Sequence, residues 1–433
     1  MRTGAATRAE QETRLRSRFH PGRVWSDVAV WWGGKNFTQD FWKFLAGDFL
    51  YDSGGYVFFL LYNLYLLDLG YRENFLGWVA GLMAVGNIVG SLPAGWAARR
   101  LGMRGVTLLC FALVPLSLAL RATLSSAPWL LALAFLGGVV SSLWPVAQPL
   151  IVADLTDTRN RPFAFSFVSA VEIGFGILAG AAGGYLPGWL SHGNRAVGAA
   201  PATRAAILVT CGLSLFALWP ASRLKLTPAP AGAERRIYPR DAFVWRFLVA
   251  TGLWSFATGA FNPFYNAYFA HFQGASVARI GMILAASQFV QVVAILAAPA
   301  LFRRVGLVTG IVLTQIACAA SLVWLSTGPQ GWGAAAAYCA YSGFQWMSDP
   351  AFYSLLMTKV VPSERAGASS LYFLVVSVVQ GVAAVVAGEA FARFGYPSVM
   401  TVIAGGILAA ALLFRFLLSG SESAQPSSLA AAE

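Results

Sequence analysis

Residues 77–104 read GWVAGLMAVGNIVGSLPAGWAARRLGMR, an apolar run long enough for a membrane-spanning helix that ends in a cluster of arginines. Residues 281–306, GMILAASQFVQVVAILAAPALFRRVG, repeat the pattern 204 positions later. Both stretches begin with glycine, carry an amide at the same interior place (Asn87 and Gln291) and end in Arg-Arg-apolar-Gly. A match of this length at one spacing indicates that the chain contains two related units.

The repeat extends beyond these two stretches. Single residues match at the same offset of 204, namely Arg161 with Arg365, Ala164 with Ala368 and Ser166 with Ser370. Four-residue motifs match at an offset of 203, namely Trp42–Leu45 with Trp245–Leu248 and Tyr62–Tyr65 with Tyr265–Tyr268. We interpret the chain as a tandem duplication of a unit of roughly 200 residues.

The composition excludes a soluble fold. Only 11% of the residues are charged and 58% are hydrophobic, whereas about 25% of a soluble domain is charged. A helix needs about 20 apolar residues to cross a hydrocarbon core of about 30 Å, and such runs follow one another here. The sequence therefore predicts an all-α polytopic membrane protein. The four cysteines lie within apolar runs and the three histidines are scattered, so we expect no disulfide, metal site or cofactor.

The apolar runs predict twelve membrane-spanning helices in two pseudo-symmetric bundles of six. The spans are placed at residues 42–69, 76–98, 105–122, 128–153, 163–188, 204–222, 243–271, 279–301, 306–326, 332–358, 366–391 and 397–418. The chain then divides into a basic N-terminal segment (1–40), a first bundle (41–222), a cytoplasmic linker (223–242), a second bundle (243–418) and a tail (419–433). The N-terminal segment fits either a short helix in the lipid headgroup region or a solvated basic tail.

The basic residues lie on alternate loops. If the N-terminus is inside, all but six of the 30 Lys and Arg residues fall on the cytoplasmic side, as the positive-inside rule requires. We therefore expect an integral protein of the plasma (inner) membrane with both termini in the cytoplasm. This topology accounts for the net charge of +12 without a nucleic-acid partner, and we expect a monomer in the lipid bilayer.

The loop between spans two and three resembles the signature of the major facilitator superfamily, whose members contain two six-helix bundles. The matching positions are Gly95, Arg100, Gly102 and Arg104 in the first unit and Arg303, Arg304 and Gly306 in the second. Arg99 stands where the family has an aspartate. In the family this acidic residue helps to hold the cytoplasmic side closed. The resemblance covers residues 41–418 and implies a transporter that works by alternating access.

The fifth span is rich in glycine, with Gly174, Gly176, Gly180, Gly183 and Gly184. This pattern loosely resembles a motif of proton-coupled drug exporters, although the proline of that motif is missing. Close packing between helices through small residues explains the same pattern without any link to export.

Buried carboxylates are the strongest candidates for chemistry, because charges within a bilayer are costly. Asp52 and Glu172 each lie about 15 Å from the start of their spans, and Asp349 lies ten residues before Lys359, so all three are expected near the midplane. Asp48 lies one turn from Asp52 on the same helix face. A carboxylate in a low-dielectric cavity can bind a proton near neutral pH, so we rank Asp349, Asp52, Glu172 and Asp48 as proton-coupling candidates. The alternative is that each makes a structural hydrogen bond or ion pair.

The resemblance also implies that spans 1, 4, 7 and 10 line a central cavity. The candidates for substrate contacts are Tyr62, Asn63, Asn87, Trp144, Gln148, Asn262, Tyr265, Asn266, Gln288, Gln291, Trp346 and Gln380. Pro145 and Pro350 are expected to kink spans 4 and 10. No Lys or Arg lies near the middle of a span, and Arg121 is placed at an outer end, so anionic substrates are disfavoured.

These features predict a secondary active transporter, most simply one that exports a small lipophilic or cationic compound in exchange for protons. Aromatic residues suit lipophilic cations through attraction to ring faces. The alternative is an uptake symporter or facilitator for a neutral polar solute such as a sugar or nucleoside, which the tyrosines and amides would suit equally. The motifs of soluble enzymes are absent from the sequence, and a re-entrant loop that would indicate a channel is not found.

Overall fold

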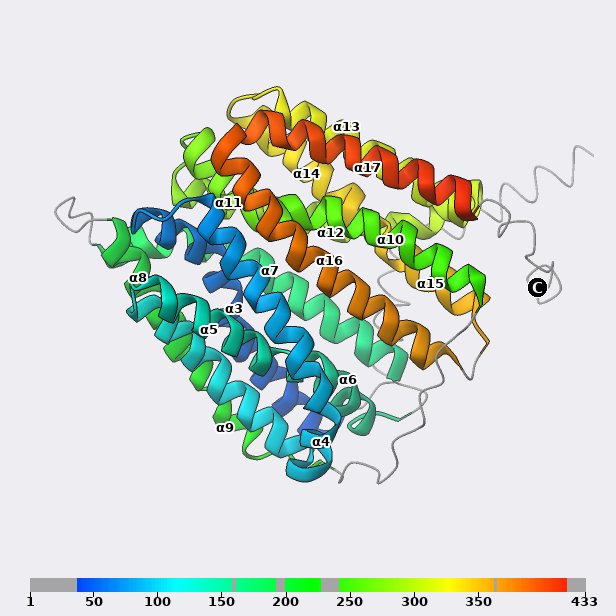
Figure 1. Ribbon diagram of the computed structural model, residues 1–433. Coiled ribbons are helices and arrows are strands. Elements are labelled where there is room, and N and C mark those ends of the chain that lie inside the picture. The colour runs from blue at the N-terminus through cyan, green and yellow to red at the C-terminus, as the bar shows by residue number, and fades with distance from the viewer. Residues whose placement is uncertain (1–36, 158–160, 192–198, 227–240, 362–363, 419–433) are drawn as a thin grey trace, which may run out of the picture.

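The computed structural model describes residues 37–157, 161–191, 199–226, 241–361 and 364–418. The expectations for the N-terminal segment, most of the linker and the C-terminal tail lie outside these residues. Within them the protein is helical throughout, and Figure 1 shows the helices gathered into two bundles, one from each half of the chain.

The first bundle contains the helices α3 (Gln39–Asp68), α4 (Glu73–Thr123), α5 (Ala127–Ser141), α6 (Leu143–Asp154), α7 (Arg161–Leu190), α8 (Ala199–Leu215) and α9 (Leu218–Ala221). The second contains α10 (Ala242–Phe261), η1 (Asn262–Phe264), α11 (Tyr265–Ala267), η2 (Tyr268–Phe272), α12 (Val277–Val305), α13 (Leu307–Ser326), α14 (Trp332–Met347), α15 (Asp349–Lys359), α16 (Arg365–Phe394) and α17 (Tyr396–Leu418). The twelve predicted spans correspond to these helices with ends shifted by a few residues.

In the described part of the chain, nine segments are long and apolar enough to cross a membrane. The three predicted spans outside this set are the first, seventh and tenth, which correspond to α3, the α10–η2 segment and the α14–α15 pair. The first carries Asp48 and Asp52, and the other two are interrupted. These are three of the four spans expected to line the cavity.

The Arg-Arg-apolar-Gly stretches form the same turn in both halves. Gly102, within α4, has φ 70° and ψ 163°, and Gly306, between α12 and α13, has φ 85° and ψ 161°. This backbone region is essentially restricted to glycine. The structure therefore explains why glycine recurs 204 residues apart: each one reverses the chain between two spans.

Three of the four predicted cavity spans are broken near a proline. The fourth span breaks at Ser142, three residues before Pro145, and the tenth at Ser348, two residues before Pro350. The seventh changes to a 3₁₀ turn at Asn262–Phe264, which contains Pro263. Proline removes a backbone donor and clashes with the preceding turn, so the expected kinks at Pro145 and Pro350 are present.

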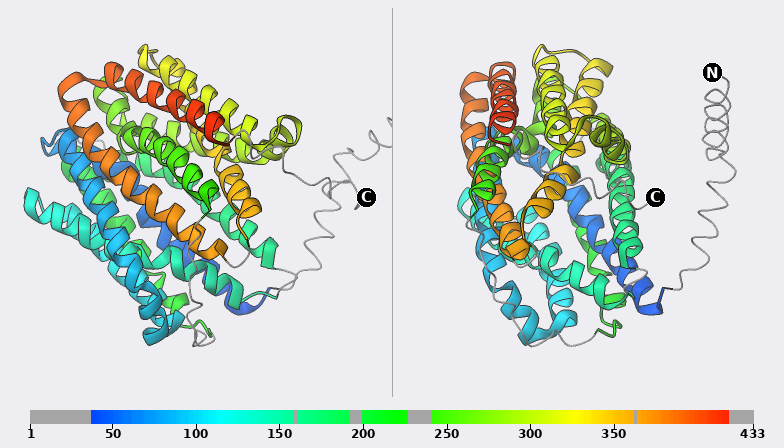
Figure 2. Two further views of the ribbon diagram at one scale, coloured as in Figure 1. Left: turned by 45° about the vertical axis from the view of Figure 1, so that its right-hand side comes forward. Right: turned by 90° about the vertical axis from the view of Figure 1, so that its right-hand side faces the viewer.

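The two bundles meet through pairs of helices, α4 with α16 and α7 with α12, and Figure 2 shows the two groups from two further sides. Glycines allow the backbones to touch. A Cβ atom on Gly281 of α12 would lie 2.3 Å from the carbonyl oxygen of Gly180 and 2.8 Å from the Cα of Gly184, both on α7. A Cβ on Gly388 of α16 would lie 2.6 Å from the carbonyl oxygen of Glu73. Two glycines of the fifth span thus serve close helix packing.

Candidate substrate pocket and carboxylate cluster

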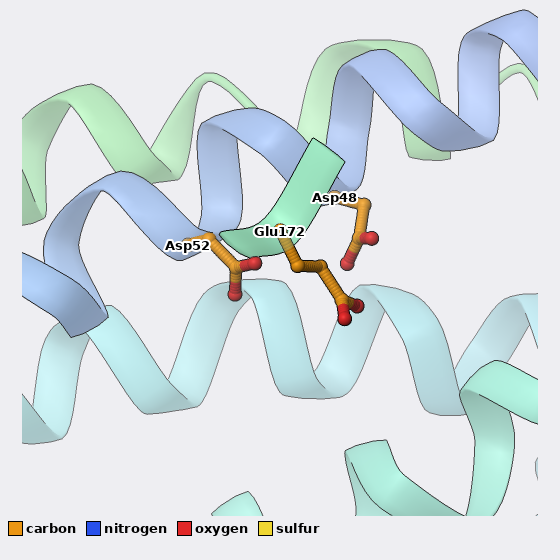
Figure 3. A group of neighbouring side chains, drawn as sticks. All are labelled: Asp48, Asp52 and Glu172. Atoms are coloured by element: carbon orange, nitrogen blue, oxygen red, sulfur yellow. The ribbon is translucent and has the colours of Figure 1, made fainter. Parts of the chain in front are cut away.

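Three of the four predicted carboxylates meet in the structure. Asp48 and Asp52 lie one turn apart on α3, and Glu172 reaches toward them from α7, as Figure 3 shows. One carboxylate oxygen from each of the three lies within 4.8 Å of the others. Asp48 is buried, with 2% of its surface exposed, and the other two are partly buried. We call Asp48, Asp52 and Glu172 the carboxylate cluster.

Gln148 of α6 ties the cluster together. Its side-chain amide donates a hydrogen bond to Glu172 Oε1 and lies 3.4 Å from Asp48 Oδ2. The second oxygen of Asp48, Oδ1, is buried without a hydrogen-bond partner. Buried carboxylates at this spacing repel one another when all are ionised, so a proton or another cation held among them would stabilise the group.

The cluster is also the group of described side chains whose spacing suits a metal ion. Oxygen-only ligands of this kind favour hard cations. The sequence predicted no metal site, and that remains a prediction.

Asp349, the first-ranked proton-coupling candidate, lies apart from this cluster. It occupies the first turn of α15, just after the break at Ser348. It lies close enough to Tyr353 and Tyr372 to interact with both electrostatically. Both tyrosines belong to the second bundle, whereas the other three candidates share one site in the first bundle.

A cavity of about 350 Å³ extends from Asp52 toward the interface with the second bundle. This volume lies within the range of about 300–1,000 Å³ that is usual for small-molecule sites. The walls are mainly apolar and aromatic. The lining residues include Tyr51, Asp52, Phe58, Phe59, Tyr62 and Asn63 from α3, Met83 and Arg121 from α4, Ser141 from α5, Trp144 from α6, and Pro263, Tyr265 and Asn266 from η1 and α11.

Six of the sequence-predicted site residues therefore line this cavity: Asp52, Tyr62, Asn63, Trp144, Tyr265 and Asn266. The other predicted polar residues lie elsewhere. Asn87 accepts a hydrogen bond from Ser141, Asn262 accepts one from Tyr341, and Gln291 donates one to Ser342. Gln288 packs near Gly176, Gln380 packs against Gly259, and Trp346 is 42% exposed.

Asn63 and Asn266 close one end of the cavity with a reciprocal pair of hydrogen bonds. Asn63 Nδ2 donates to the carbonyl oxygen of Pro263 at 2.6 Å, and Asn266 Nδ2 donates to that of Leu60 at 3.1 Å. Asn63 Nδ2 also donates to Asn266 Oδ1 at 3.2 Å. Donors and acceptors are each 203 residues apart, so the duplicated motif makes the same contact twice across the bundle interface.

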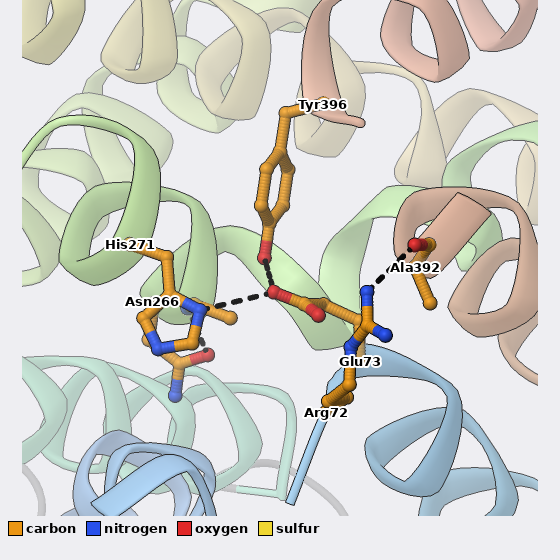
Figure 4. A network of polar contacts seen from close by, with 7 residues as sticks. Arg72, Glu73, Asn266, His271, Ala392 and Tyr396 are labelled. Carbon is orange, nitrogen blue, oxygen red and sulfur yellow. Dashed lines mark hydrogen bonds and ion pairs between the residues drawn. The ribbon is translucent and has the colours of Figure 1, made fainter. Parts of the chain in front are cut away.

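A second set of contacts joins the bundles at the same end, and sequence reasoning missed it. Glu73 of α4 is 8% exposed; its Oε1 accepts a hydrogen bond from Tyr396 Oη of α17 and lies 3.1 Å from His271 Nδ1 of η2. Figure 4 shows the carboxylate between these two partners. Arg72 also donates to the carbonyl oxygen of Ala392 at 2.9 Å. We call the trio Glu73, His271 and Tyr396 the latch, and the end of the bundles where it lies the latch end.

Arg121 bears on the expectation that anionic substrates are disfavoured. It lies near the end of α4, as expected, but it is buried (2% exposed) and lines the cavity. Its guanidinium carbon lies 4.3 Å from the ring centre of Tyr62 and 4.9 Å from that of Phe58. That expectation rested on the absence of a basic residue near the middle of a span, and Arg121 brings a positive charge to the cavity wall from near a helix end. The sequence did contain a signal for this role. Arg121 is a basic residue on the outer side of the membrane, where the positive-inside rule predicts few basic residues.

The loop motif is described only in part. The surroundings of Gly95 and the side chain of Arg99 lie outside the described set, so the consequence of the missing aspartate stays a prediction. Arg104 donates a hydrogen bond to the carbonyl oxygen of Ser222, and Arg303 and Arg304 are exposed.

Two helical bundles with a pocket at their interface, together with the family match, identify an integral membrane transporter and not an enzyme. The sequence model of the Major Facilitator Superfamily matches residues 44–378, and the chain belongs to that family. A comparison with curated proteins gives no match.

Solved structures of transporters share this fold at low sequence identity. The nucleoside transporter NupG is 13% identical with a TM-score of 0.72, over 88% of this chain and 99% of that one. A bacterial homologue of the lysosomal transporter Spinster is 14% identical with a TM-score of 0.71, over 89% and 98% of the two chains. The xylose transporter XylE from E. coli is 14% identical with a TM-score of 0.70, over 86% and 94%.

Proposed function

We propose that this protein exports a small lipophilic organic compound in exchange for protons, with both termini in the cytoplasm and the latch end facing outward. The observation that carries the proposal is the position of Asp52. It belongs to the carboxylate cluster and also lines the cavity. A solute bound beside Asp52 and a proton bound within the cluster would therefore influence each other directly.

The sign of the coupling between solute binding and proton binding favours exchange of the solute for protons. Mutual repulsion within the carboxylate cluster favours binding of a proton when the cavity is empty. A solute with a positive or hydrogen-bond-donating group would bind best when Asp52 is ionised. Proton and solute then compete for one carboxylate, and competition for a shared site produces antiport when the site alternates between the two sides of the membrane.

Uptake of a neutral polar solute remains the second candidate. It is favoured by the hydroxyl and amide groups that Tyr62, Asn63, Tyr265 and Asn266 bring to the cavity wall. In that case the proton would bind together with the solute instead of competing with it.

The full chain in proteoliposomes tests the proposal with ethidium as a lipophilic cation and uridine as a neutral polar solute. We expect an imposed pH gradient to drive ethidium against its concentration gradient. Asp52→Asn should lower this gradient-driven transport at least tenfold but preserve exchange of labelled for unlabelled ethidium, because the variant loses the proton site and keeps the cavity.

Asp349→Asn is the matched control, since it removes a partly buried carboxylate outside the cluster, and it should retain gradient-driven transport. Gradient-driven uridine uptake in place of ethidium export would support the second candidate. An Asp52→Asn variant that responds to the gradient like the unmodified protein would overturn the coupling role of the cluster.

A further inference from the structure

Three polar groups on the wall of the cavity are buried without partners. Arg121 Nε, Tyr62 Oη and Tyr265 Oη each have almost no accessible surface and make no hydrogen bond with the part of the chain that the structure describes. All three residues line the same cavity, and each is at most 3% exposed. Native proteins satisfy nearly all buried polar groups, so three unsatisfied groups on residues that line one cavity favour a ligand that these side chains turn toward when it binds.

The charge of Arg121 narrows the ligand class. An arginine side chain keeps its positive charge in proteins. Its recorded polar contact is weak, from Nη1 to Met83 Sδ at 3.9 Å, and among the described residues no acidic side chain pairs with it. The guanidinium is attracted to the ring faces of Phe58 and Tyr62. These contacts leave the Nε donor of Arg121 without an acceptor among the described residues.

The two charged groups of the cavity, Asp52 and Arg121, lie at different heights along the axis of α3. Phe58, beneath the guanidinium, follows Asp52 by six residues on α3, which is about 9 Å along the helix axis. Between these levels the wall is aromatic and aliphatic. A solute bound at Arg121 can therefore extend a lipophilic body toward Asp52.

We propose that the transported solute carries an acidic oxygen group, a carboxylate or a phosphate, which binds Arg121 with help from the hydroxyls of Tyr62 and Tyr265. Arginine matches the geometry of both groups with two parallel hydrogen bonds. The inference rests on the proposed function only in taking this cavity as the place where the solute binds. It defines the solute as an amphipathic acid, and competition with the proton then requires a positive or hydrogen-bond-donating group at the end of the solute that lies beside Asp52.

Binding to the full chain in neutral-detergent micelles tests the site without requiring transport. The probes are 2-naphthoate, 2-naphthyl phosphate and the neutral 2-naphthamide, which share one aromatic body, and quenching of tryptophan fluorescence reports binding because Trp144 lines the cavity. At least one acid should bind about tenfold or more tightly than the amide, the range expected for a charged hydrogen-bonded pair.

Arg121→Gln should remove the preference for the acid, with a much larger loss of affinity for the acid than for the amide. Arg121→Lys should retain part of the preference, which guards against a loss caused by misfolding. Tyr62→Phe and Tyr265→Phe keep the aromatic rings and delete only the hydroxyls, so each should weaken acid binding by several-fold. The inference is overturned if neither acid binds more tightly than the amide, or if Arg121→Gln binds the acid as the unmodified protein does.

A lipid headgroup could supply the same acidic group. Repeating the measurement in nanodiscs with phosphatidylglycerol would show competition with the naphthyl acids if a lipid occupies the site, and unchanged affinity if a free solute does. Because this assay uses no pH gradient, binding of the acids together with a failure of gradient-driven transport would reject the coupling mechanism while supporting the site.

Discussion

Gly281→Val is expected to lower transport at least tenfold while the protein still reaches the membrane. The backbones of α7 and α12 touch at this residue, and even a single Cβ atom would lie 2.3 Å from the carbonyl oxygen of Gly180. Overpacking of this kind costs about 1–3 kcal/mol, which corresponds to a shift of about five- to 150-fold in an equilibrium constant. The valine should therefore disfavour the arrangement in which the bundles are closed at the latch end.

Chemical labelling checks this shift directly. A cysteine placed at Phe59, which lines the cavity, on a background with the four native cysteines replaced, should react faster with a membrane-impermeant maleimide added from the latch side when Gly281→Val is present. Gly174→Val is the matched control, because it adds the same side chain to α7 where a Cβ atom meets no other atom within 4 Å. Equal labelling and equal transport in Gly281→Val and the unmodified protein would show that this contact is not required for closure.

Glu73→Ala is expected to shift the same equilibrium toward the state open at the latch end by about tenfold to hundredfold. The substitution removes the acceptor that joins α4 to both His271 and Tyr396. Hydrogen bonds to a charged group are worth about 1.5–3 kcal/mol each, and part of this is recovered when the opened groups contact water. The labelling assay at Phe59 measures the change.

Variants that each remove one hydrogen-bond partner of Glu73 separate the loss of the latch from damage to the start of α4. Glu73 lies in the first turn of α4, where an acidic side chain also stabilises the helix. Tyr396→Phe and His271→Ala leave that helix end intact, and each should produce a smaller shift in the same direction. A double-mutant cycle of Glu73→Ala with Tyr396→Phe should then give a combined effect smaller than the sum of the two single effects. Simple additivity would indicate that the two side chains act independently.

Much of the fold could be predicted from the sequence because a bilayer constrains a chain so strongly. Backbone groups within lipid must bond internally, so long apolar runs give helices, and their ends agree with the predicted spans to within a few residues. The duplication could be read from short motifs, because the turns at Gly102 and Gly306 need the same unusual backbone and hence the same residue.

The site was less accessible to sequence reasoning. Depth along a helix nominated Asp349, Asp52 and Glu172, with Asp349 ranked first, but depth does not reveal which faces of distant helices meet. The meeting of Glu172 with the α3 pair depends on how α7 packs against α3. Arg121 was counted as a marker of topology because it lies close to a helix end, and only its burial beside Phe58 and Tyr62 reveals it as part of the cavity wall.

The reciprocal amide contact between Asn63 and Asn266 has an evolutionary consequence. Each half gives one donor to the other half and accepts one in return, at positions 203 residues apart. This is the arrangement of an isologous interface in a twofold homodimer, where one residue serves both subunits. A six-helix ancestor could thus have assembled as a pair of identical subunits joined by a single asparagine, before fusion allowed one copy to keep the acids and the other to diverge.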